Sequence, residues 1–527
     1  MGFISKINRP LSHDEKIRLI QGVLFAVIIV LGSYFRLIHL HDNPGWYFDE
    51  GEYINYADNL YHGHWQLFNI VATPMLLMRP PLFVYLLAGT FSVFGVGIIQ
   101  ARTLVVILSL IEFIFIYRIG RKIGERNLTV LAMALYAILP QFVEFDRMAY
   151  TYAATGLFGL MGVDFILTWL ENKRHAWWLL ACLAAGLAVS SDYIGLVFAC
   201  AICLVIVVKD PKRFFPTLII ILIPVALVLT PAFIFSPKFA LEDMGFVYGY
   251  RISSPLMSQI TNIIINYGEL IRSENWVVVG IAGLFLIPHS RVRYFILGIT
   301  LASLILIVHT ALPVGRGMHY LILVFPYLAI GMAFFMLKAY SIVYGVLIEW
   351  FIQKNTIVKA FGKMGSYTLA IWLIFSPMVW MLLANISQSV QGYYFLFTGN
   401  NDMALVSSAD AEKVISYLKL HAMNDSIMLA SADLAWALPS ERVADLNCAL
   451  SNDINHWSDQ PVVNLNQRQF FSCSLSNTDY VVLTPHSVKY AVSLDPRMTL
   501  LLDRIYTWNL VYQAGSLAVY HNPLKSP

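Results

Sequence analysis

Residues 18–40 read RLIQGVLFAVIIVLGSYFRLIHL, a predominantly apolar run. A helix needs about 20 apolar residues to cross the ~30 Å hydrocarbon core of a bilayer, so this run is long enough to span it. Further apolar blocks follow at 104–117, 214–235 and 320–337. Hydrophobic residues make up 58% of the chain and charged residues 13%, whereas soluble domains have about 45–50% and about 25%. We therefore predict a polytopic α-helical membrane protein rather than a soluble globule.

The first apolar block is too long for the core of a signal peptide and lacks a small-residue cleavage site, so we expect it to remain as an anchor. The formal net charge of +3 gives no reason to expect a nucleic-acid partner. The prediction is therefore a multi-pass protein of the cell (inner or plasma) membrane.

Lysine and arginine cluster in short segments, which the positive-inside rule assigns to the cytoplasm. These segments are 6–18, 118–126, 173–174, 209–213, 291–293 and 338–363. The loops between them, expected outside, are 41–98, 144–151, 191–193, 236–274 and 313–318. The alternation requires that Pro80–Gly97 does not cross. This segment is short and bracketed by prolines and glycines, so we interpret it as a re-entrant or juxtamembrane helix in the first outer loop. About eleven spans remain, with the N-terminus in the cytoplasm and the C-terminus outside.

From about residue 388 the composition becomes that of a soluble domain. Residues 408–420 have the spacing of an amphipathic helix, and 426–431, 479–484 and 510–523 are typical of strands between polar turns. We predict a transmembrane domain over 1–387 and a small extracytoplasmic α/β domain over 388–527. Cys448 and Cys473 fall in the second region and can form a disulfide if it faces an oxidising compartment.

Charged residues gather at the outer ends of the predicted spans, where each costs about 2.5–3.5 kcal/mol on insertion scales and therefore suggests a function. They come from five separate ends: Asp49 and Glu50 with Arg79; Arg102; Glu144, Asp146 and Arg147; Asp192; and Arg316 with His319 and Tyr320. Carboxylates and guanidiniums on one face suit an anionic ligand and proton transfer.

Moving a sugar from a phosphate to a hydroxyl requires a base at the hydroxyl and positive charge at the departing phosphate. Asp49 or Glu50 can supply the base. The substrate-binding candidates are Arg79, Arg102, Arg147, Arg316, His319 and Tyr320. Glu144 and Asp146 have the acid-x-acid spacing that can hold a divalent cation such as Mg²⁺ or Mn²⁺.

Structural interpretations stand beside these functional ones. Asp49 and Glu50 can cap a juxtamembrane helix. Arg102 fits an interfacial anchor equally well, and Arg147 fits an ion pair with the acids next to it. His319 fits an ordinary polar contact better than a ligand.

One series of motifs resembles the GT-C membrane glycosyltransferases. It consists of Trp46-Tyr-Phe-Asp-Glu-Gly-x-Tyr53, then Arg79-Pro-Pro-Leu, Phe94-Gly95 and Ala101-Arg102. The resemblance covers residues 30–210 and is closest to the branch of protein O-mannosyltransferases and lipid A aminoarabinose transferases. It implies a polyprenyl-phosphate sugar donor, inversion at the anomeric carbon, a base at Asp49 and a second juxtamembrane helix that stays outside.

The chain departs from the family pattern in two places. Members often have an aspartate shortly after the arginine that corresponds to Arg147, whereas Ala149, Tyr150 and Thr151 follow here. Many also carry a lysine near the turn at Ser190–Tyr193, where this chain has Asp192. Both differences concern the donor site.

The leading hypothesis is a glycosyltransferase of the cell envelope, acting on a protein, lipid or glycan acceptor. One alternative is a flippase or transporter of a lipid-linked or acidic solute. Such proteins favour ionisable groups near the midplane and repeated halves, neither of which the sequence shows. Another is an O-antigen ligase or polymerase, which the early Asp-Glu loop does not fit well.

Overall fold

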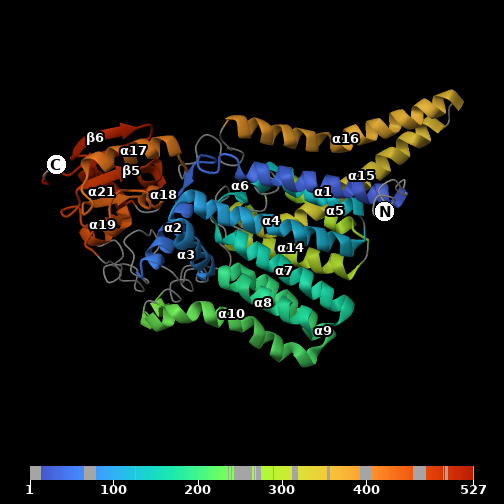
Figure 1. The fold of residues 1–527 in the computed structure, drawn as a ribbon, viewed down its shortest axis with the longest axis horizontal. Coiled ribbons are helices and arrows are strands. Elements are labelled where there is room, and N and C mark those ends of the chain that lie inside the picture. The colour runs from blue at the N-terminus through green and yellow to red at the C-terminus, as the bar shows by residue number, and fades with distance from the viewer. Residues whose placement is uncertain are drawn as a thin grey trace, which may run out of the picture.

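The computed structural model describes residues 13–64, 79–124, 126–235, 237–238, 240–242, 261, 264–265, 268, 275–288, 290–310, 318–352, 356–391, 405–454, 471–490, 492 and 496–525. A helical bundle and a smaller α/β region lie at opposite ends of the molecule (Figure 1). Helices α2 (Phe48–Tyr61) and α3 (Leu82–Phe94) lie between them.

The bundle follows the hydropathy of the sequence. Its remaining α-helices are α1 (His13–Leu37), α4 (Ile98–Ile123), α5 (Arg126–Ile138), α6 (Pro140–Phe145), α7 (Thr151–Asn172), α8 (His175–Ser191), α9 (Leu196–Lys209), α10 (Phe214–Phe235), α13 (Asn275–Leu286), α14 (Arg291–Thr310), α15 (Phe325–Ile352) and α16 (Thr356–Gln391). Short 3-10 turns are η2 (Tyr193–Gly195), η3 (Pro211–Arg213) and η4 (Met318–Val324). Within the described residues, six helical segments are long and apolar enough to cross a membrane, and five more are apolar but shorter.

The burial of these helices shows which are central. In α7, 83% of the apolar window is buried, whereas in α16 the share is 11% and in α10 it is 22%. Figure 1 accordingly shows α10 and α16 along opposite sides of the bundle. The prediction of a polytopic helical membrane protein is confirmed, while the number and orientation of the crossings stay predictions.

Close helix packing uses small residues, as is common in membrane bundles. Helices α13 and α15 approach so closely that a Cβ at Gly280 would lie 2.9 Å from Leu328. Buried charges are paired as well. Asp164 in α7, for which the sequence suggests no partner, binds Arg118 at 2.6 Å and also Lys122, both in α4.

Helix α3 covers most of the segment predicted not to cross. Its 13 residues extend only ~20 Å at 1.5 Å per residue, well short of the hydrocarbon thickness. The Tyr85 hydroxyl donates a hydrogen bond to the Val228 carbonyl of α10 at 3.1 Å, so α3 packs against the bundle. These features agree with a juxtamembrane helix.

The C-terminal region contains a five-stranded sheet in the order β4-β3-β5-β7-β6. Its strands are β3 (Ile427–Ala430), β4 (Arg442–Ala444), β5 (Tyr480–Leu483), β6 (Asn509–Ala514) and β7 (Leu517–His521). Strand β3 pairs in parallel with β4 and β5, and β7 pairs antiparallel with β5 and β6. The three predicted strand segments are confirmed, whereas β4 has no clear signal in the sequence.

Among the described residues, four α-helices accompany the sheet. They are α17 (Ser408–His421), α18 (Ala432–Ala435), α19 (Leu446–Ile454) and α21 (Met498–Ile505). The predicted amphipathic helix corresponds to α17, and its Val414 and Leu418 are buried. Cys448 and Cys473 form a disulfide, as the sequence allowed. The domain boundary at residue 388 and the extracytoplasmic location stay predictions.

Candidate active site

Helix α2 carries the predicted base. Asp49 lies in its first turn, where the helix dipole favours a negative charge. Tyr53 follows four residues later, and this spacing places the two side chains on the same face of the helix. The charge of Asp49 also acts on the Tyr53 hydroxyl. The face that Asp49 and Tyr53 share is therefore the starting point for the site.

The neighbouring carboxylate, Glu50, points into the protein and is completely buried. Its two oxygens accept hydrogen bonds from Nε and Nη2 of Arg102 at 2.9 and 2.6 Å. Its Oε1 also accepts one from the Ala149 amide at 2.7 Å. A buried carboxylate is stable only when it is paired and hydrogen-bonded. Through these bonds, Glu50 connects α2 to α4 and to the turn after α6.

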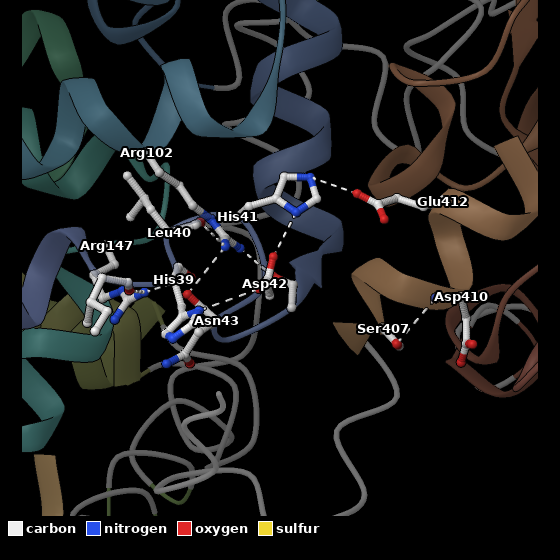
Figure 2. A network of polar contacts seen from close by, with 12 residues as sticks. His39, Leu40, His41, Asp42, Asn43, Arg102, Arg147, Ser407, Asp410 and Glu412 are labelled. Atoms are coloured by element: carbon white, nitrogen blue, oxygen red, sulfur yellow. Dashed lines mark hydrogen bonds and ion pairs between the residues drawn. The ribbon is translucent and has the colours of Figure 1, made fainter. Parts of the chain in front are cut away.

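Arg102 is also completely buried. Besides Glu50, it donates to the carbonyls of Leu40 at 2.9 Å and Asn43 at 3.4 Å, and to that of Gly45. Figure 2 shows the guanidinium directed at the 39–43 loop. This geometry favours a positioning role for Arg102 over the predicted contact with substrate.

Arg147, like Arg102, binds backbone carbonyls. It donates to the carbonyls of Phe35 at 2.9 Å and His39 at 3.0 Å, at the end of α1 and just beyond it. Figure 2 places it next to His39. Two of the predicted substrate-binding arginines, Arg102 and Arg147, thus hold the turn that leads into α2.

The predicted metal pair is partly engaged in another contact. Asp146 is 1% exposed and forms an ion pair with the buried Arg36 at 2.7 Å. Within the described part of the chain, no three histidine, cysteine or acidic side chains are grouped so that they could hold a metal. Asp146 therefore joins α1 to the end of α6, and the metal-binding role of Glu144 and Asp146 stays a prediction.

Arg79 stands just before α3 and faces Asp49's side of α2. Its guanidinium lies 5.5 Å from the ring centres of both Tyr53 and Tyr152, and it donates a hydrogen bond to the Tyr53 hydroxyl. Tyr152 is in the first turn of α7, and its ring is 4.6 Å from that of Tyr320 in η4. Four distant segments thus meet around one cation.

The electrostatics keep this cation charged. Burial would lower the pKa of Arg79, but the oxygens of Tyr152, Tyr53, Tyr320 and Asp192 raise it well above its usual value. Burial also raises the pKa of the Tyr53 hydroxyl, which Arg79 opposes only partly. Because Tyr53 accepts from Arg79, its own proton remains able to bind an anion. The site combines a fixed positive charge with a hydroxyl donor.

Asp192, in the turn between α8 and η2, is 1% exposed and accepts a hydrogen bond from the Ile194 amide at 3.0 Å. It caps η2 and places a carboxylate close enough to act on Arg79. Arg316 lies outside the described residues, and so does the side chain of His319. Their predicted roles stay predictions.

Sequence reasoning missed the two tyrosines that flank the guanidinium, Tyr53 and Tyr152. Neither is among the site residues predicted from the sequence. Tyr53 belongs to the first-loop motif, four residues after Asp49, whereas nothing near Tyr152 distinguishes it from other tyrosines at helix ends.

Comparison with known proteins agrees with this architecture. Residues 78–238 match the model of the dolichyl-phosphate-mannose-protein mannosyltransferase family. None of the curated proteins compared with the chain has a matching sequence. The match covers the segment from Arg79 through α10, which includes the positions of Arg102, Tyr152 and Asp192.

The fold is similar to that of solved structures. ArnT from Cupriavidus metallidurans in the apo state has a TM-score of 0.61 and 13% identity, over 96% of this chain and 98% of that one. The same protein bound to undecaprenyl phosphate has a TM-score of 0.59 and 12% identity, over 96% and 99%. The archaeal oligosaccharyltransferase AglB from Archaeoglobus fulgidus, in complex with an inhibitory peptide and a dolichol-phosphate, has 0.55 and 13%, over 96% and 75%.

The chain therefore has the fold of these solved structures, and its residues 78–238 are similar to the dolichyl-phosphate-mannose-protein mannosyltransferase family. The likeness to ArnT covers 96% of this chain and therefore extends into the C-terminal region.

Proposed function

We propose that the protein transfers a sugar from a polyprenyl-phosphate donor to an acceptor hydroxyl at the outer face of the membrane. The observation that carries this proposal is the half-buried guanidinium of Arg79, held against Tyr53 on the same helix face as Asp49. A permanent charge in a partly buried site binds phosphate, and a carboxylate one helical turn from Tyr53 can take a proton.

The proposed step is a single displacement. Asp49 accepts the proton of the acceptor hydroxyl while the acceptor oxygen bonds to the anomeric carbon. The bond between that carbon and the phosphate oxygen breaks, and polyprenyl phosphate leaves with both electrons. Arg79 and the Tyr53 hydroxyl stabilise the charge that develops on the phosphate. Because the base and the leaving group act on opposite sides of the anomeric carbon, the configuration inverts.

The donor class rests on two further points. The fold resembles that of proteins solved with undecaprenyl phosphate and with dolichol-phosphate. The described residues also include apolar helices against which a polyprenyl chain can lie. The sugar and the acceptor are left open by these observations, since both protein and lipid acceptors fit a site at the membrane surface.

The test is sugar transfer or release from a synthetic polyprenyl-phosphate sugar by the purified protein in detergent. Asp49→Asn should lower kcat by about 10²–10⁴-fold, the usual contribution of a general base, without loss of membrane insertion. Asp58→Asn is the matched control, because Asp58 lies at the other end of α2 and pairs with His62 at 3.1 Å.

A companion variant separates binding from proton transfer. Arg79→Met removes the charge at similar length and should weaken binding of polyprenyl phosphate, measured directly with the labelled lipid. Asp49→Asn should leave that binding nearly unchanged. Wild-type turnover by Asp49→Asn would remove the base assignment, and undiminished lipid binding by Arg79→Met would remove the phosphate assignment.

A further inference from the structure

The segment that bears Asp49 is held by the C-terminal region as well as by the bundle. Strand β1 (Trp46–Tyr47) pairs antiparallel with β2 (Leu405–Val406), the strand just before α17. On the preceding loop, the His41 ring reaches Glu412 of α17 at 3.6 Å, which Figure 2 shows from close by. The approach to the catalytic helix is therefore joined to residues far along the chain.

Two ring contacts also join this segment to the C-terminal region, one from Trp46 within β1 and one from Phe48 just after it. The Trp46 ring is 4.8 Å from that of Trp436, just after α18. The Phe48 ring is stacked on His486 at 3.8 Å with an angle of 10° between the planes. Phe48 is the residue immediately before Asp49, so the C-terminal region holds the backbone at the first residue of α2.

Gly51 and Asn55 continue the contact along α2. A Cβ at Gly51 would overlap the Ala432 carbonyl and lie 2.6 Å from the Asp433 amide nitrogen, so only glycine permits this approach. Asn55 Nδ2 donates to the carbonyls of Gly51 at 2.7 Å and Ala432 at 3.0 Å. Both residues are buried. Helix α18 thus packs directly on the first turns of the catalytic helix.

The two sides of the site are consequently held by different parts of the protein. Arg79 precedes α3 and is flanked by Tyr152, a residue of the bundle, as well as by Tyr53 of α2. Asp49 lies between Phe48, held by the C-terminal region, and Glu50, held by Arg102 of the bundle. A shift of α18 would move the carboxylate relative to the guanidinium. In enzymes, a displacement of about 1 Å can lower the rate about 10²-fold.

We infer that the C-terminal region is a positioning element for the catalytic helix, with Gly51 and Asn55 as positioning residues that set the location of Asp49 through Ala432. This inference rests on the proposed function. It assigns the C-terminal region a part in the transfer step itself, in addition to any contact with the acceptor.

The test compares Gly51→Ala with Gly89→Ala. Gly89 is exposed in α3, and a Cβ there would meet nothing within 4 Å, so the same added methyl serves as the control. Gly51→Ala should lower kcat about 10²-fold, while Gly89→Ala should retain wild-type kcat. The KM for the donor should change less than kcat in Gly51→Ala, because Arg79 keeps its contact with Tyr152 of the bundle even if Tyr53 shifts with α2.

The stacked pair gives a second and milder perturbation. His486→Ala removes the ring that supports Phe48 and should lower kcat, whereas His486→Phe keeps a ring and should restore most of it. Asn55→Ala should lower kcat in the same direction. A merely structural role would lower the amount of folded protein in each variant without this split between kcat and KM.

The outcomes separate the inference from the proposed function. If the wild-type protein transfers no sugar from a polyprenyl phosphate, the proposed function fails. If the wild type is active and Gly51→Ala and His486→Ala match Gly89→Ala in kcat, the positioning role is refuted and the proposed function stands. Equal changes in kcat and in donor binding would also refute it, since the donor site itself would then be disturbed.

Discussion

The buried carboxyl of Asp433 makes the C-terminal region sensitive to pH. Asp433 is fully buried in α18, and its Oδ1 accepts a hydrogen bond from Ser431. Its Oδ2 has no hydrogen-bond partner among the described residues. Burial is the main reason that its pKa rises from 3.8 to about 7, with the charge of Asp445 adding to the effect. The folded protein therefore keeps a proton that the unfolded chain would release.

The size and sign of the effect follow from linkage. A pKa difference of about 3 corresponds to about 4 kcal/mol at 1.36 kcal/mol per pKa unit. Between about pH 4 and pH 7 the folded state binds more protons than the unfolded state, so the stability of the region falls as the pH rises. Above about pH 7 Asp433 is charged in the folded as well as the unfolded state, so the folded region carries the full destabilisation of about 4 kcal/mol. Asp433→Asn, which resembles the protonated acid in shape, removes it.

Hydrogen exchange of peptides from residues 427–444 in the full-length protein measures the local opening free energy. The difference between Asp433→Asn and wild type should grow from near zero at about pH 4 to about 4 kcal/mol at pH 8. Asp425→Asn, an exposed change on the same region, serves as the control and should show no such trend. A difference that is flat with pH, or that shrinks as the pH rises, would refute the reasoning.

Two further predictions concern stability. Arg102→Met leaves Glu50 buried without its counter-charge and should destabilise the protein by about 3–5 kcal/mol, while Glu50→Gln in the same chain should recover part of the loss. Thermal unfolding of the four variants measures this coupling, and strictly additive losses would contradict it. Replacing Cys448 and Cys473 by serine opens a cross-link between residues 25 apart and should cost about 3 kcal/mol. Faster hydrogen exchange around α19 tests this, and unchanged protection would exclude it.

The fold was predictable to the extent that it depends on local patterns. Hydropathy is sufficient to identify the bundle, because a lipid environment requires long apolar helices. The composition of 479–484 and 510–523 likewise predicts strands there, whereas the division of the second segment into β6 and β7 is seen only in the structure. Strand β4 could not be found, since only three residues of it pair with β3. The pairing of β1 with β2 was also out of reach, because two-residue strands carry no periodic signal.

The candidate site was predictable only in part, because a guanidinium at the end of a helix can face either a ligand or the backbone. Arg79, Arg102 and Arg147 look alike in the sequence. In the structure, Arg79 faces tyrosine rings on the Asp49 side of α2, whereas the other two bind backbone carbonyls around residues 35–45. The direction of each of these three guanidiniums is set by contacts between residues that are more than 25 positions apart in the sequence. Those contacts require the folded chain.

The ladder between β1 and β2 has a consequence for biosynthesis. Trp46 aligns with Val406, so the segment between α1 and α2 must wait for its partner strand until most of the polypeptide has been translated. At about 5–20 residues per second, that interval is on the order of half a minute. During this time the segment with Asp49 lacks its final support, and a newly inserted chain would acquire catalytic geometry only after its last quarter has folded onto the membrane-embedded part.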